Sequence, residues 1–190
     1  ALLFVAGLAA WFSVERRGWL VGGFAGLMAL VAVIALYVGI VRPFAPPSPP
    51  NSQEIAQASA VNRTFGDDLE LVALRWGDGT NTPPMSSTRL TLYWRMVQPS
   101  RNDLRTALRL IDGDGHLIWE WKRSPGAGRF STDRWPPGRL VADAYRIPPA
   151  ALDKAARIEV GVSIFPTGNW LPVQGEGSSA QFLTLYPAGE

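Results

Sequence analysis

Residues 88–97 read TRLTLYWRMV, a stretch in which apolar and other side chains alternate. The apolar side chains share one face, which consists of Leu90, Leu92, Trp94 and Met96. The opposite face consists of Arg89, Thr91, Tyr93 and Arg95. This period of two is typical of a β-strand with one face in a core. The stretch therefore predicts a β domain around it.

The rest of the chain after residue 60 carries the same kind of pattern. Residues 157–165 alternate clearly, with Ile158, Val160, Val162 and Ile164 on one face. Weaker patterns predict six further strands, at Val61–Phe65, Leu69–Trp76, Leu104–Ile111, His116–Lys122, Arg139–Ile147 and Gln181–Tyr186. Turn-forming stretches separate the strands, and only a short helical turn is expected between them, at 149–156. We therefore expect an antiparallel, immunoglobulin-like β-sandwich of about seven or eight strands.

A proline-rich stretch, PFAPPSPP at 43–50, precedes this domain. Its prolines lack amide donors and cannot continue a helix, so we expect an extended spacer. The sequence then divides into a membrane segment at 1–42, a proline-rich extended linker at 43–60 and an extracytoplasmic β-sandwich at 61–190.

A run without charge extends over 19–41, WLVGGFAGLMALVAVIALYVGIV. As a helix it would span roughly 34 Å, which exceeds the hydrocarbon core of a bilayer at about 30 Å. The apolar run 1–12 is too short to cross alone and begins without a basic leader. We expect it to be the end of a truncated first helix. The two runs then form a transmembrane hairpin in the lipid bilayer, beside upstream transmembrane helices of the same protein.

The connector between these runs, 13–18, indicates the orientation of the hairpin. It contains Arg16 and Arg17 and is flanked by Trp11 and Trp19, which suit the level of the lipid headgroups. Basic residues of short loops remain in the cytoplasm. We therefore expect the β domain on the extracytoplasmic side of an integral membrane protein.

Composition excludes several classes of function. The formal net charge is +2, and it arises before residue 51, where Arg16, Arg17 and Arg42 outnumber Glu15. The β part is neutral and shows no basic stripe, so we expect no nucleic-acid partner. The chain has no cysteine, which excludes disulfides, thiolate metal sites and cysteine nucleophiles.

The motifs supply no catalytic or metal-binding constellation. Asp112-Gly-Asp-Gly-His116 resembles the start of a calcium loop, but apolar residues follow where further oxygen ligands are needed. We interpret it as a hairpin turn. His116 is the one histidine of the chain, and no serine lies in a nucleophile elbow. We therefore expect no catalytic residue, metal or cofactor in this sequence.

Tryptophans are frequent in the β part. Trp119 and Trp121 share a face with Leu117, so we expect them in the core. Trp135 and Trp170 lie in expected loops, where each ring either packs at the edge of the sandwich or stacks on a sugar. With Tyr93, which lies on the strand face opposite Trp94, they form a candidate carbohydrate-binding set that could reach solvent.

The order of several segments resembles the C-terminal region of bacterial membrane glycosyltransferases related to protein O-mannosyltransferases and the lipid A aminoarabinose transferase. After a final spanning helix these segments are RPFAPP, VNRTFGDDLELVAL, STRLTLYWR, LRLIDGDGHLIWEW and RWPPGRLVADAYRIP. They cover most of residues 19–165, and ALDKAARIEVGVSIFPTGNW departs from the pattern. The resemblance implies an enzyme of the bacterial plasma membrane that transfers sugar from a polyprenyl-phosphate donor. The acidic residue implied for catalysis belongs to an early loop that this sequence does not contain.

Three interpretations fit these observations. The chain is either the C-terminal part of such a transferase, with an accessory β-sandwich that binds glycan or acceptor, or a non-enzymatic anchored sandwich that binds a protein or glycan of the cell envelope. A purely structural spacer domain fits the residues as well. Whether the parent protein is an enzyme is therefore left open by the sequence.

The orientation can be tested with reporters fused after Glu190. Alkaline phosphatase, which is active only outside the cytoplasm, should be active there, whereas a reporter that needs the cytoplasm should be silent. Moving Arg16 and Arg17 to the other end of the 19–41 run should weaken this orientation, because the basic residues determine it. A cytoplasmic pattern for the unaltered chain would contradict the assignment.

Overall fold

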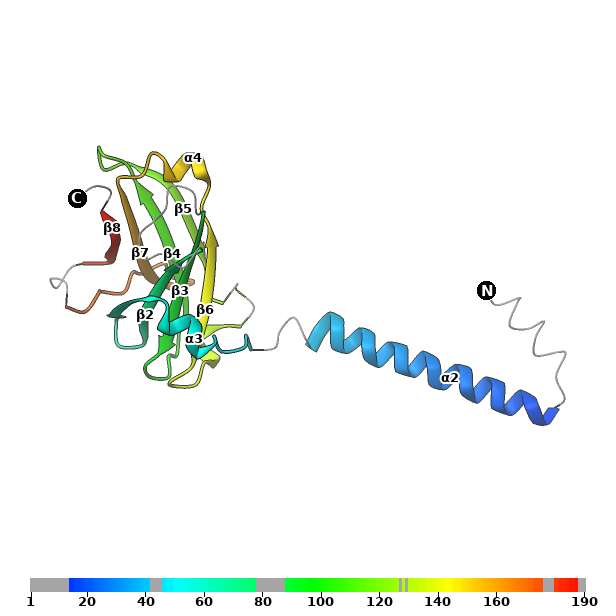
Figure 1. Ribbon diagram of the computed structural model, residues 1–190. Helices are drawn as coiled ribbons and strands as arrows, with labels where there is room; N and C mark the ends of the chain where they lie inside the picture. The colour runs from blue at the N-terminus through cyan, green and yellow to red at the C-terminus, as the bar shows by residue number, and fades with distance from the viewer. Residues whose placement is uncertain are drawn as a thin grey trace. The chain divides into compact units, whose positions relative to one another are not determined.

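The computed structural model describes residues 14–41, 46–77, 88–126, 128, 130–175 and 180–187 of the chain. They belong to two compact units, 1–45 and 46–190, which are considered separately (Figure 1). The first unit contains one long helix, and the second contains eight β-strands in its described part.

The helix of the first unit, α2 (Val14–Leu36), continues without a break into the π-helical turn η1 (Tyr37–Val41). It is long and apolar enough to cross a membrane, which makes it a candidate anchor. The predicted helix is confirmed, but the connector expected at 13–18 is wrong from Val14 onward. Glutamate and arginine are good helix formers, so the backbone is already helical there. The first apolar run, 1–12, lies outside the described residues.

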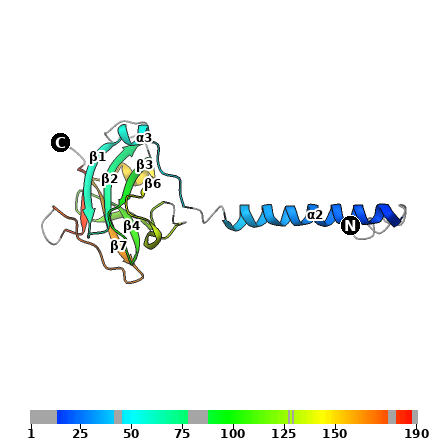
Figure 2. The ribbon, with the colours of Figure 1, turned by 90° about the horizontal axis from the view of Figure 1, so that it is seen from below.

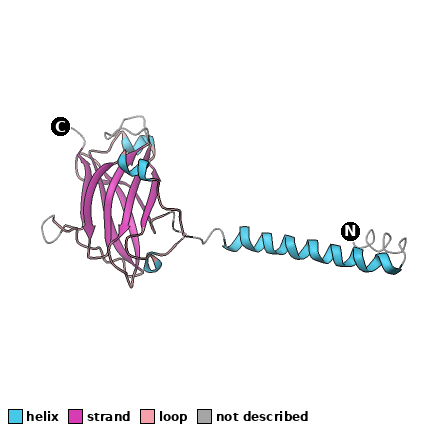
Figure 3. Cartoon of the chain, turned by 60° about the horizontal axis from the view of Figure 1, so that its bottom comes forward, coloured by secondary structure: helices cyan, strands magenta, loops and turns pink. Residues whose placement is uncertain are grey.

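The second unit is a sandwich of two antiparallel four-stranded sheets, as predicted (Figure 3). Its strands are β1 (Ser59–Phe65), β2 (Leu69–Trp76), β3 (Arg89–Met96), β4 (Asp103–Ile111), β5 (Leu117–Arg123), β6 (Leu140–Arg146), β7 (Arg157–Phe165) and β8 (Phe182–Pro187). One sheet has the order β1-β2-β3-β6 and the other β5-β4-β7-β8. An immunoglobulin domain instead places its first, second, fifth and fourth strands in one sheet. The immunoglobulin-like part of the prediction is therefore not confirmed by this order.

The inner faces of both sheets form one hydrophobic core. All four apolar residues predicted for the inner face of β3 are fully buried, and the ring of Trp94 meets Phe65 edge-on at 5.6 Å between centroids. From the other sheet Val160 and Val162 pack into the same core. The alternation seen in the sequence thus determines which side of each sheet points inward.

The segment that precedes β1 belongs to the sandwich and contains a short helix, α3 (Ser52–Ala56). The Asn51 side chain accepts a hydrogen bond from the Gln53 amide and so caps this helix. Before it, the guanidinium of Arg139 donates to the Pro47 carbonyl oxygen. Helix α3 lies over the outer face of the β1-β2-β3-β6 sheet (Figures 1 and 2). Part of the expected linker is thus packed against the β domain.

A buried polar cluster joins the edge strands β5 and β6, where the two sheets meet. The Arg123 guanidinium on β5 donates to the buried Asp143 carboxylate on β6 at 2.8 Å and to the Ala144 carbonyl oxygen at 2.6 Å. The Tyr145 hydroxyl lies 2.7 Å from the Thr106 hydroxyl. Burial, and then the negative charge of Asp143, raise the pKa of Tyr145 well above its ordinary value. These contacts hold one open side of the sandwich together.

Replacing Arg123 by methionine tests this role. The variant keeps an apolar stem but removes the cation that neutralises a buried carboxylate, so we expect a loss of roughly 3 kcal/mol in the free energy of unfolding. The matched control is Arg95→Met, because Arg95 pairs with Glu70 on the surface and should cost less than about 1 kcal/mol. Urea unfolding of the sandwich measures both, and equal losses would contradict the assignment.

Candidate functional site

The outer face of the β5-β4-β7-β8 sheet carries a cluster of aromatic and cationic side chains. We call it the Trp170 face. It consists of Arg109 on β4, Lys122 on β5, Gly161 on β7, Phe182 on β8, the small residue Ala107 beside them, and Trp170 in the loop after β7.

Small residues at the centre of this face let aromatic rings lie flat on the sheet. In the register, Lys122, Ala107, Gly161 and Phe182 form one row across the four strands. A Cβ atom added at Gly161 would lie 2.5 Å from Cε1 of Phe182, so the ring occupies the place of a side chain. An isolated glycine inside a strand often marks such a close approach.

Trp170 is positioned by the chain folding back along β7. The Ile164 amide donates to the Asn169 carbonyl oxygen at 2.9 Å, and the Leu171 amide donates to the Val162 carbonyl oxygen at 2.8 Å. Trp170 pairs with Ser163 across this bridge, so their side chains share the outer face. The partly exposed indole lies 4.6 Å from the Phe182 ring, centroid to centroid.

Two cations approach these rings from the neighbouring strands. The Lys122 ammonium lies 4.3 Å from the centroid of Trp170. The Arg109 guanidinium carbon lies 4.0 Å from the centroid of Phe182 and 4.9 Å from that of Trp170. Arg109 is also paired with Glu120 at 2.6 Å. Aromatic rings beside hydrogen-bond donors are the usual chemistry for holding a sugar, whose apolar face stacks while its hydroxyls are bound.

The three residues predicted as a carbohydrate set do not come together. Trp170 lies on the outer face of one sheet, whereas Tyr93 lies on the outer face of the other. The expectation that all three rings reach solvent is wrong for Tyr93, which has 0% exposure, and for Trp135, which has 2%. Helix α3 lies over the face that carries Tyr93 (Figures 1 and 2). Trp135 is in the core, and its indole N–H donates to the Phe130 carbonyl oxygen at 3.1 Å.

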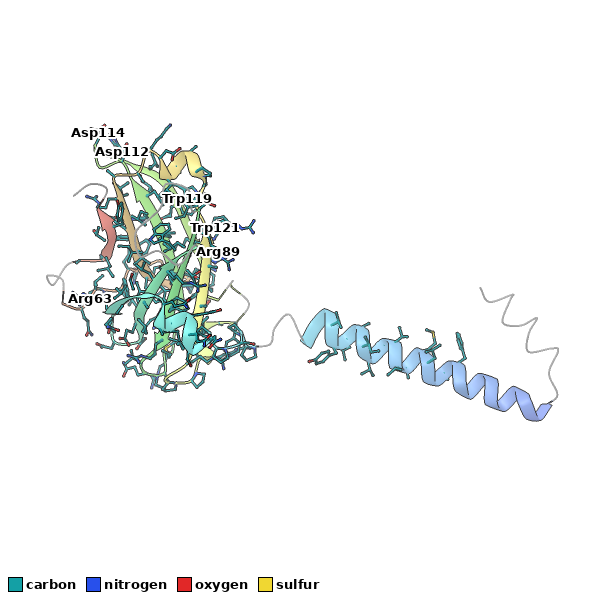
Figure 4. All side chains as sticks on the ribbon, viewed as in Figure 1. Arg63, Arg89, Asp112, Asp114, Trp119 and Trp121 are labelled. Atoms are coloured by element: carbon teal, nitrogen blue, oxygen red, sulfur yellow. The ribbon has the colours of Figure 1, made fainter. Side chains whose placement is uncertain are left out.

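The tryptophans of β5 are less buried than predicted. Trp119 packs against the core, but Trp121 is 46% exposed and Leu117 is 52% exposed. Both tryptophans project from the same strand (Figure 4). Trp121 is paired with the core residue Leu108, yet β5 is the edge of its sheet and the opposite sheet covers it only in part. The core prediction therefore fails for Trp121.

The turn between β4 and β5 brings three potential metal ligands together. Asp112 and Asp114 lie at the tip of the hairpin (Figure 4). Each of them and His116 offers one ligand atom, and these atoms lie within 4.8 Å of one another. The Asp112 carboxylate already accepts hydrogen bonds from the Asp114 amide at 3.0 Å and the His116 amide at 2.8 Å. The His116 bond is the main reason that the pKa of Asp112 is lowered. These contacts confirm a hairpin turn.

Comparison with profiles of known protein families, with curated proteins and with solved structures finds no significant match to this chain. The interpretation of the Trp170 face therefore rests on its own geometry.

Trp170 could be identified from the sequence, but its partners could not. Lys122, Arg109 and Phe182 lie on three different strands, and the sheet register together with the bridge from Ser163 to Trp170 brings them near that ring. The sequence signal that could have indicated a close ring contact is Gly161, an isolated glycine within a clear strand pattern.

Proposed function

We propose that this chain is the anchored C-terminal part of a bacterial glycosyltransferase that uses a polyprenyl-phosphate sugar donor. Its β-sandwich serves as an accessory domain that holds a glycan on the extracytoplasmic side of the plasma membrane. The ordered sequence segments that resemble this family support the proposal, together with a candidate spanning helix followed by a separate β unit.

The observation that carries the glycan-binding role is the placement of Trp170. Its indole lies with Phe182 on the face of a sheet rather than in the core, and it is partly exposed. An aromatic surface of this kind contacts the C–H groups of a sugar ring, while neighbouring donors bind its hydroxyls. Lys122 and Arg109 supply such donors, each lying over the face of a ring.

Binding can be measured by calorimetry on the full chain in nanodiscs, with empty nanodiscs as the blank. The probes are neutral hexasaccharides from mannan, glucan and galactan, together with a galacturonic acid hexamer. We expect at least one to bind, and Trp170→Ala to weaken that binding about tenfold, because the stacking surface is lost. Trp121→Ala is the matched control, since Trp121 is exposed on the other face of β5, and it should change the affinity less than about twofold.

Unfolding midpoints of the same variants separate binding from folding. The Trp170→Ala variant should still unfold in one cooperative transition. If the unaltered chain binds none of the probes and Trp170→Ala mainly lowers the midpoint, the ring is a packing element and the proposed role is wrong.

A non-enzymatic, membrane-anchored sandwich that binds an envelope protein is the second candidate. It is favoured by the exposed Leu117 and Trp121 on β5, which is the edge strand of its sheet. Exposed apolar side chains on an edge strand are typical of protein-binding surfaces.

Membranes that express the gene of this chain separate the two candidates. The transferase proposal predicts transfer of labelled sugar from a polyprenyl-phosphate donor, and a lower rate when residues 46–190 are deleted. The Asp112→Asn variant, altered only in an exposed turn, is the control for expression and should retain the rate. Membranes without transfer activity would favour the non-enzymatic module.

A further inference from the structure

The cations on the outer side of the β5-β4-β7-β8 sheet differ in whether a carboxylate is paired with them. The outer face of this sheet carries Arg109 and Lys122 of the Trp170 face, and beside them Arg105 and Arg157. Arg109 is paired with Glu120 at 2.6 Å and Arg157 with Glu159 at 2.7 Å. Within the described ranges, no carboxylate lies in salt-bridge distance of Arg105 or Lys122. These two cations are therefore available to an outside anion.

Both of the available cations lie against aromatic rings. The Lys122 ammonium lies 4.3 Å from the Trp170 centroid, and the Arg105 guanidinium carbon lies 3.6 Å from the Phe165 centroid. A ring attracts a cation but does not neutralise it, and an ammonium keeps its N–H donors for an acceptor. Arg109 is a weaker candidate, because its guanidinium already has a carboxylate partner.

A buried hydroxyl on the same face also lacks a partner. Ser163 is 1% exposed, and its Oγ has no hydrogen-bond partner among the residues that the structure describes. The register places it between Arg105 on β4 and Trp170 in the returning loop. The Nε atom of Arg105 is likewise buried without a partner. Buried polar groups normally have hydrogen-bond partners. The Ser163 hydroxyl and the Arg105 Nε–H group therefore retain unused hydrogen-bonding capacity near Trp170.

We propose that the glycan bound on the Trp170 face is acidic, carrying a phosphate or a carboxylate on a sugar that stacks on Trp170. The ammonium of Lys122 binds the anion, and Arg105 and Ser163 supply further donors from the row of the sheet that pairs with Trp170. This inference rests on the proposed glycan-binding function. It adds the class of ligand, which neither the ring nor the fold defines by itself.

Pairs of probes that differ only in charge test the inference on the full chain in nanodiscs. One pair is a galacturonic acid hexamer and its methyl ester, in which the same carboxylates are neutral. The other is phosphorylated pentamannose and its dephosphorylated form. We expect the acidic member of at least one pair to bind about tenfold more tightly, and higher salt to reduce this preference. The pair that responds identifies the anion.

Lys122→Gln should reduce the preference to about twofold or less, and Lys122→Arg should retain most of it, because arginine keeps the charge. The chain offers a matched control in Lys154→Gln, since Lys154 is exposed in the turn after α4 (Pro149–Leu152). The control should not alter the preference. Unfolding midpoints of all three variants verify that each is folded.

The possible failures are distinguishable. Equal affinity for charged and neutral probes, or a preference unaffected by Lys122→Gln, overturns the acidic ligand but leaves the glycan-binding function standing. Binding of none of the probes overturns both. Inorganic phosphate that binds as tightly as the phosphorylated sugar would show that the sugar contributes nothing, and would likewise overturn the proposal.

Discussion

The alternation of side chains across two packed sheets is the constraint on which the rest of this β domain depends. Each strand must place every second residue in the common core, so the residues between them are left on an outer face. On β4 the core takes Leu108 and Leu110, and Arg109 between them is thereby directed outward. On β7 the same rule puts Gly161 outside, between Val160 and Val162. The aromatic and cationic face is thus a consequence of how the core is filled.

The strands could be predicted from the sequence because their signal is local. The interval expected for β2, Leu69–Trp76, agrees with the structure at both ends, and the inward faces of β3 and β7 are those that alternation indicates. The exposure of single side chains depended on contacts that a local pattern does not contain. Tyr93 is buried on a face over which α3 lies, and that helix falls in a segment expected to be an extended linker. Trp121 is exposed because β5 is an edge strand, a property of the sheet order.

The candidate site was predictable only in its most conspicuous residue. Trp170 could be named because a tryptophan in a loop is unusual, but its neighbours come from three other strands. The partner of Asp143 could not be predicted from the sequence either, because Arg123 lies 20 positions earlier and on the opposite sheet. Residue types do not indicate which of 16 acidic and 18 basic residues will meet. Register and sheet order determine these pairs, and both arise from packing of the whole domain.

The contact between Phe182 and the bare backbone of Gly161 has a consequence for how this face can change during evolution. A larger residue at position 161 would displace the Phe182 ring, since even one added carbon would overlap it. Positions 105 and 122 place their charged groups outward, where neither fills the core. Substitution there can reverse or remove charge while the aromatic surface and the inner packing are preserved. One scaffold of this kind could therefore be adapted to a succession of ligands without being refolded.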